Sequence, residues 1–192
     1  MELQDYEFLG ERVKIIPMTE EHIHALFKAG QQEEIWDYMP RRVFNINDMK
    51  VLVKEALSDK KKGTSLPFII MDLQINEIVG STRFTDIDLK NRHLEIGWTW
   101  LNPKVWRTNV NSECKYLLLK YCFEHLKLTR VQLKADERNT RSLQAIERIG
   151  AQREGVFRKE RILPDGFIRN TVYYSILDEE WVDVKKRLKS ML

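Results

Sequence analysis

The sequence has few cysteines. Cys114 and Cys122 are the two thiols among 192 residues, and they lie eight positions apart in a segment with helical spacing. At ~1.5 Å of rise per residue they are about 12 Å apart along a helix axis, which is too far for a disulfide. Two core-facing thiols are typical of a protein in a reducing compartment. Because there is no Cys-x-x-Cys motif and no paired His–Cys cluster, no metal site is expected.

Long apolar runs and targeting signals are also missing. No segment reaches the length of a membrane span, and Glu2 and Asp5 stand where a signal peptide would have a basic and then an apolar region. We therefore expect a cytoplasmic protein without membrane contact. We find no internal repeat, linker or low-complexity segment. With 43% hydrophobic and 32% charged residues, the chain is expected to form one domain over residues 1–192.

The charge excess is small. Lys and Arg number 32 against 29 Asp and Glu, which gives a net charge of +3. Such a balance does not indicate a dedicated nucleic-acid binder, although it would not repel an anionic ligand. The lysine run at 60–62 is more typical of a solvated loop than of a ligand patch.

The most informative segment is 94–155. Apolar residues alternate from Leu94 to Trp100, which predicts a strand, and the period becomes helical from Val110 onward. A second strand is predicted at 130–135. Asn139 is a suitable N-cap for a second helix, and Gly150 a suitable residue to end it. The order strand, helix, strand, helix favours two parallel strands joined by the first helix.

The rest of the chain predicts a mixed sheet. Helices are expected at 20–29, at 48–57 and after Asp178, and strands are expected at 13–17, 67–73, 77–84, 156–163 and 168–177. Pro164-Asp165-Gly166 is a strong turn signal between the last two strands. The predicted class is α+β, with a central sheet of about seven strands and helices on both faces.

The loop before the central helix has no glycine, although a helix N-terminus is a favourable anion site. Arg107 adds a charge there. Asn109 and Asn111 are, after glycine, among the residues that most readily take a left-handed conformation, and we expect a positive φ at Asn109. These features are compatible with a pyrophosphate site, and equally with a capped helix behind a polar loop.

Several spaced motifs of this segment resemble the GNAT acetyltransferase superfamily. The motifs are Glu95-Ile96-Gly97-Trp98, Asn111-Ser112-Glu113-Cys114-Lys115, Asn139-x-x-Ser142 followed by Gly150, and Glu154-Gly155-x-x-Arg158. They are similar to those of the ribosomal-protein N-terminal acetyltransferase branch. The signature Gln/Arg-x-x-Gly-x-Gly/Ala aligns with 106–111, where Trp106 takes the first position and asparagine both glycine positions.

The resemblance implies a single domain in which two strands splay apart to bind acetyl-CoA. By this resemblance the cofactor-binding residues would be Trp98, Thr99, Trp106, Arg107, Thr108, Asn109, Val110, Asn111 and Asn139. The backbone of the first strand would hold the pantetheine arm and polarise the thioester carbonyl. The amides at the helix start would hold the pyrophosphate.

The resemblance also implies direct attack by an amine, which needs a general base. Glu95 is the predicted base, although it could equally be a solvated or ion-paired strand residue. Ser142 is the predicted acid for the leaving thiolate, because Ile146 occupies the position of the usual tyrosine; capping of the helix start is an equal alternative. His93 is a weaker base candidate, and Arg138 and Arg141 could reach phosphate or simply be solvated.

Three functions are consistent with some of these observations. The first is acetyl transfer from acetyl-CoA to a peptide or protein N-terminus or to a small amine, by a monomer or homodimer. The second is a GNAT-fold protein with weak or lost catalysis that binds CoA or a partner, since both motif glycines and the tyrosine are absent. The third is an unrelated α+β binding protein, for example of nucleic acid, which the mild charge disfavours.

Overall fold

The protein folds around one open mixed sheet. The computed structural model describes residues 6–192, in which eight strands follow the order β1-β2-β3-β4-β5-β6-β8-β7. The strands are β1 Phe8–Leu9, β2 Val13–Pro17, β3 Ser65–Asp72, β4 Glu77–Asp88, β5 His93–Leu101, β6 Arg130–Asp136, β7 Gln152–Ile162 and β8 Ile168–Leu177. The predicted fold class is confirmed. The sheet has eight strands rather than about seven because residues 8–9 add a short strand at one edge.

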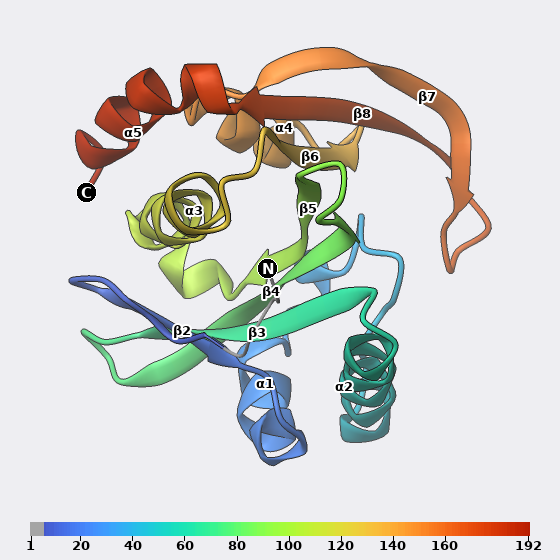
Figure 1. The fold of residues 1–192 in the computed structure, drawn as a ribbon. Coiled ribbons are helices and arrows are strands. Elements are labelled where there is room, and N and C mark those ends of the chain that lie inside the picture. Colours follow the sequence, from blue (N-terminus) through green and yellow to red (C-terminus); the bar gives the residue numbers. More distant parts are fainter. Residues whose placement is uncertain (1–5) are drawn as a thin grey trace.

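Helices cover both faces of the sheet (Figure 1). They are α1 Ile23–Ala29, α2 Ile46–Lys61, α3 Val110–Lys120, α4 Thr140–Arg148 and α5 Trp181–Lys189. One apolar cluster joins α1 and α2 to Ile69 and Trp100 of the sheet. A second, larger cluster joins α3, α4 and α5 to the other face. The helix expected at 48–57 is longer, because the Asn45 side chain accepts hydrogen bonds from the Asn47 and Asp48 amides and starts it earlier.

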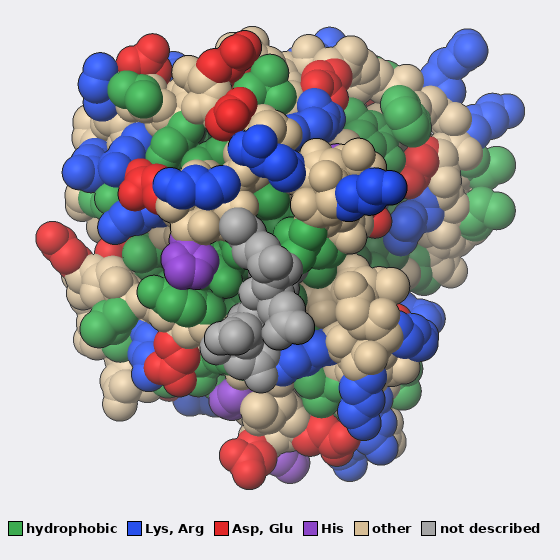
Figure 2. Space-filling model, viewed as in Figure 1, with side chains coloured by type: hydrophobic (Ala, Val, Ile, Leu, Met, Phe, Trp, Pro, Cys, Tyr) green, Lys and Arg blue, Asp and Glu red, His purple; other side chains and the backbone are tan. Residues whose placement is uncertain are grey.

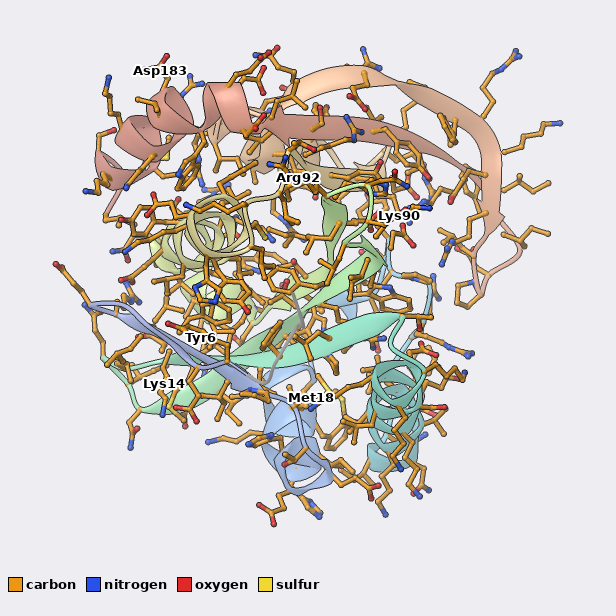
Figure 3. All side chains as sticks on the ribbon, viewed as in Figure 1. Tyr6, Lys14, Met18, Lys90, Arg92 and Asp183 are labelled. Atoms are coloured by element: carbon orange, nitrogen blue, oxygen red, sulfur yellow. The ribbon has the colours of Figure 1, made fainter. Side chains whose placement is uncertain are left out.

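The predicted parallel pair is β5 and β6. It is short, since His93, Leu94 and Glu95 pair with Arg130, Val131 and Gln132, and pairing stops there. The turn before β5 fixes one end of the pair: the carbonyl of Arg92 accepts a hydrogen bond from the Thr129 amide at 2.8 Å, and the Arg92 side chain donates to the Lys127 carbonyl at 2.8 Å (Figure 3). The other end is left free to separate.

A bulge in β5 bends the strand beyond that point. Between the pairs Arg83–Gly97 and Ser81–Trp100, β5 contains one residue more than β4. Trp98 takes a positive φ of 53° there, which is unusual for a residue with a side chain. The bulge directs the second half of β5 away from β6, so the sheet opens between them.

Polar contacts anchor the start of α3 to the opposite edge of the sheet. The buried Glu113 carboxylate accepts hydrogen bonds from the backbone amides of Glu11, Arg12 and Val13 at 2.6 to 3.1 Å. Gly10 is required beside it, because a Cβ there would lie 2.2 Å from Glu113 Oε1. The Arg12 guanidinium bridges the buried Asp72 carboxylate and the Asn109 side chain.

We expect Glu113→Ala to destabilise the fold by about 3–5 kcal/mol, because several backbone amides would lose a charged acceptor. Glu113→Gln should cost less, since one acceptor oxygen remains. Urea unfolding measures both, with Glu179→Ala, a change at an exposed glutamate, as the matched control. A Glu113→Ala midpoint equal to that of Glu179→Ala would show that this carboxylate does not anchor the helix.

Candidate active site

A cavity of about 1020 Å³ opens where β5 and β6 separate. This is the size of a pocket for a large small-molecule ligand, for which roughly 300–1,000 Å³ is usual. Its walls come from β4, β5, the loop before α3, β6 and α4. The segments that line it most continuously are 95–101, 105–108, 133–136 and 139–142.

Most of the predicted site residues meet at this cavity. Its lining includes Glu95, Trp98, Thr99, Trp106, Arg107, Thr108, Asn111, Asn139 and Ser142. Asn109 and Val110 are outside the lining. The Asn109 side chain instead accepts a hydrogen bond from Arg12 at 3.1 Å and donates to the Leu192 carbonyl at 3.2 Å, and Val110 is fully buried in the core.

The left-handed turn of the loop falls on a residue that the sequence did not single out for it. Asn109 has a φ of −75° and already belongs to the helix start, so the expected positive φ at Asn109 is wrong. Arg107 takes it instead, at 61°. The physical reason is that Asn109 is held by its contacts with Arg12 and Leu192, so the chain must reverse before it. Thr108 completes the turn, since its hydroxyl donates to the Val105 carbonyl and accepts from the Val110 amide.

Cationic side chains surround the helix start. Arg107 lies at the cavity surface, and Arg141 of α4 stacks over the Trp106 ring with its guanidinium carbon 3.4 Å from the ring centre. Arg138 does not contribute. It pairs with Asp136 at 2.8 Å and packs over the Phe167 ring. The first amides of a helix have no intrahelical acceptor, so this end of the cavity suits an anion.

The sequence missed Lys115. This lysine lies on α3, it is buried, and it lines the cavity. Its ammonium donates to Thr99 Oγ1 at 2.8 Å, and the Thr99 hydroxyl is in turn 2.8 Å from that of Thr82. Burial lowers the pKa of Lys115. Its place one turn after Asn111 is the signal that could have found it, because residues four apart share a helix face.

Glu95 is buried on β5, with 2% of its surface exposed. Its Oε2 accepts a hydrogen bond from Gln132 at 2.9 Å and pairs with the Lys134 ammonium at 2.8 Å. Its Oε1 points toward Gly97, where a Cβ would lie 2.5 Å away. Desolvation raises the pKa of Glu95, and the opposing effects of Lys134 and Gln132 are smaller. One carboxylate oxygen is therefore held in place, and the other makes no hydrogen bond within residues 6–192.

Asn139 and Ser142 form the start of α4. Asn139 caps the helix as predicted, because its side-chain oxygen accepts from the Ser142 amide at 3.0 Å. The Ser142 hydroxyl lines the cavity, as does Ile146. His93 does not line it. That histidine is partly exposed and faces Asp88 at 3.8 Å.

Arg83 of β4 is another residue that the sequence did not reveal. It is 4% exposed, it lines the cavity, and its guanidinium lies over the Trp98 ring at 4.3 Å. Burial lowers the pKa of Arg83 to about 10, which corresponds to a cost of about 3 kcal/mol for keeping the charge at neutral pH. An arginine inside a strand of small and apolar residues was the available signal.

The described part of the chain offers little to other classes of site. Across residues 6–192, no group of three or more His, Cys, Asp or Glu side chains could hold a metal ion. No helix in this range is long and apolar enough to cross a membrane. On the face seen in Figure 2, acidic side chains lie among the basic ones rather than apart from them.

Comparisons with known proteins agree with this geometry. The model of the acetyltransferase (GNAT) domain matches residues 12–152. The uncharacterized N-acetyltransferase YnaD of Bacillus subtilis (strain 168) is 28% identical over 158 residues, which cover 82% of this chain and 88% of YnaD. A crystal structure of an acetyltransferase from T. thermophilus is 34% identical, with a TM-score of 0.91 and coverage of 100% of both chains.

YdaF of Bacillus subtilis (strain 168), named as a candidate ribosomal N-acetyltransferase, is 33% identical over 104 residues, which cover 54% of this chain and 56% of YdaF. The chain belongs to the GNAT acetyltransferase family and, by class, is an acyl-CoA-dependent N-acetyltransferase. This confirms the family predicted from the central motifs.

The position of the left-handed turn can be tested by stability. We expect Arg107→Gly to leave the free energy of unfolding unchanged or to raise it by up to about 1 kcal/mol, because glycine takes a positive φ without strain. Asn109→Gly should lower it by about 1 kcal/mol, since glycine is unfavourable at a helical φ. Denaturant unfolding of the two variants gives the comparison, and the reverse order would return the turn to Asn109.

Proposed function

We propose that the protein transfers the acetyl group of acetyl-CoA to a primary amine, either a peptide or protein N-terminus or a small amine, by direct attack in a ternary complex. The observation that carries the proposal is the opening between β5 and β6, since it joins an anion-binding helix start to the buried Glu95 within one cavity. A thiol-release assay with acetyl-CoA and a panel of amines and peptides tests it. Binding of acetyl-CoA without turnover of any amine would favour a CoA-binding module instead.

The cavity fits acetyl-CoA in size and charge. Its volume of about 1020 Å³ accommodates a long thioester arm. Arg107, Arg141 and the first amides of α3 offer positive potential for the pyrophosphate. The unpaired half of β5 leaves backbone groups free to hold the pantetheine arm, because β6 no longer pairs with it after Glu95.

Glu95 is proposed as the general base. An amine is mostly protonated at neutral pH and must lose a proton before it attacks the thioester. Glu95 Oε1 has no other hydrogen bond in the described structure, and desolvation raises the pKa of this carboxyl toward the range of an effective base. Lys134 keeps the group ionised while holding Oε2 in place. The proton therefore passes from the amine to Oε1, directly or through one water.

Ser142 is proposed as the acid for the leaving thiolate. As the amine nitrogen forms its bond to the acetyl carbon, the thioester carbon–sulfur bond breaks and the electron pair stays on sulfur. The Ser142 hydroxyl lines the cavity at the start of α4 and could donate a hydrogen bond there. A backbone N–H of β5 would stabilise the negative oxygen of the intermediate.

Charge reversal tests the pyrophosphate site. Arg107→Glu should weaken acetyl-CoA binding several-fold, because a negative charge would face the phosphates. Calorimetry at low salt measures this, and Arg153→Glu, at an exposed position of β7 outside the cavity lining, is the matched control. If both variants bind acetyl-CoA as the wild type does, the pyrophosphate lies elsewhere.

The proton transfers have their own pH signature. Glu95→Gln should lower kcat by ~10²-fold or more with little change in acetyl-CoA affinity, while Ser142→Ala should lower it more modestly because solvent also protonates a thiolate. Lys134→Met removes a positive charge from Glu95, so the pKa of Glu95 should rise and the acidic limb of the kcat profile should move to higher pH.

His93→Gln is the control for these variants, because this histidine is outside the cavity lining. Its kcat and pH profile should match those of the wild type. If Glu95→Gln and Ser142→Ala both keep nearly wild-type kcat, catalysis rests mainly on positioning of the two substrates, and the proton-transfer roles are wrong.

A further inference from the structure

Three buried polar atoms that line the cavity have no hydrogen-bond partner in the described structure. They are Ser65 Oγ, Arg83 Nε and Trp100 Nε1, on residues that are 5%, 4% and 4% exposed. All three can donate a hydrogen bond. Buried polar groups in folded proteins are nearly always satisfied, so three unsatisfied donors on one cavity indicate an acceptor that binds there.

Arg83 contributes the only full charge of the three. It has no ion pair within residues 6–192, and its contact with the Trp98 ring compensates only part of the lost hydration. Burial lowers the pKa of Arg83 to about 10, while Asp59 and Glu55 favour its charged form from a distance. The side chain is therefore a cation at neutral pH without a counter-ion.

Arg83 and Glu95 project from the same face of the sheet. Arg83 is opposite Gly97 and Thr85 is opposite Glu95 in the β4–β5 ladder, while Ser65 is opposite Thr85 in the β3–β4 ladder. Directly opposed residues, and residues two apart on one strand, point to one face. Glu95 Oε1 also leans back toward Gly97. The proposed base thus lies beside the unpaired guanidinium.

We propose that the acceptor is a small amine that also carries a carboxylate, as a free amino acid does. Arg83 would bind the carboxylate, with Ser65 and Trp100 as further donors, while Glu95 takes the proton of the amine. A guanidinium offers a carboxylate two parallel hydrogen bonds. A singly charged anion matches the single unpaired cation, whereas a phosphate dianion would also face Asp59 and Asp86 in the same lining.

This inference rests on the proposed function, and the first experiment separates the two. Calorimetry of the CoA-loaded enzyme measures binding of free amino acids and of the corresponding amino acid amides, which lack the carboxylate charge. At least one free amino acid should bind about tenfold or more tightly than its amide. The thiol-release assay with acetyl-CoA is then run on the same pairs of compounds.

Arg83→Gln should weaken binding of that amino acid about tenfold or more, bring the acid and its amide to similar affinity, and raise KM more than it lowers kcat. Arg153→Gln, which removes an exposed arginine outside the cavity lining, should change none of these values. Arg83→Gln should also melt no lower than the wild type, because it removes an uncompensated buried charge. A purely structural arginine would give a lower melting temperature.

The outcomes are distinct. Equal affinity for acids and amides, or a preference for peptides with neutral side chains, overturns the inference while leaving acetyl transfer intact. Weaker binding of acetyl-CoA itself to Arg83→Gln also overturns it, since the arginine would then serve the cofactor. Binding of an amino acid that depends on Arg83 but gives no acetylation supports the inference and overturns the proposed function. If no free amino acid binds, the inference is wrong.

Discussion

The separation of β5 from β6 is the constraint on which the candidate site depends. Three residue pairs join these strands, and the Arg92 carbonyl fixes the pair at its start. The bulge at Trp98 then turns β5 away. A continuous ladder would have closed the cavity and satisfied the β5 backbone internally. Because pairing stops at Glu95, the last paired residue on β5 is also the carboxylate that faces the opening.

The charges within the cavity are poorly compensated by the protein itself. Glu95 has Lys134 on one oxygen only, Lys115 has a neutral threonine, and Arg83 has an aromatic ring. Burying incompletely paired charge costs stability. The anchoring contacts elsewhere, such as the Glu113 carboxylate with its backbone amides and Arg12 with Asp72, are by contrast fully paired. The protein satisfies its structural charges and leaves those of the cavity available to ligands, which is the expected distribution in an enzyme.

Much of the fold could be predicted because it depends on local patterns. The apolar alternation before Trp100, the Asn139 cap and the glycine at position 150 each act within a few residues, and all three predictions hold. The turn in the loop was misplaced from Asn109 to Arg107 because the contacts that hold Asn109 come from Arg12 and Leu192, far away in the sequence. Arg83 and Lys115 escaped notice for the same reason, since only the register of β4 on β5 and the packing of α3 bring them to the cavity.

The absence of glycine from the loop before α3 is then less of an anomaly than the sequence suggests. A glycine there would supply a positive φ and close access to the backbone, but no charge. Arg107 takes the positive φ itself, at a strain cost of roughly 1–2 kcal/mol, and places a guanidinium at the cavity surface beside the helix start. The backbone conformation and the cation that attracts an anion are thus supplied by one residue. Thr108 stabilises this arrangement, because its hydroxyl bonds to the loop on both sides.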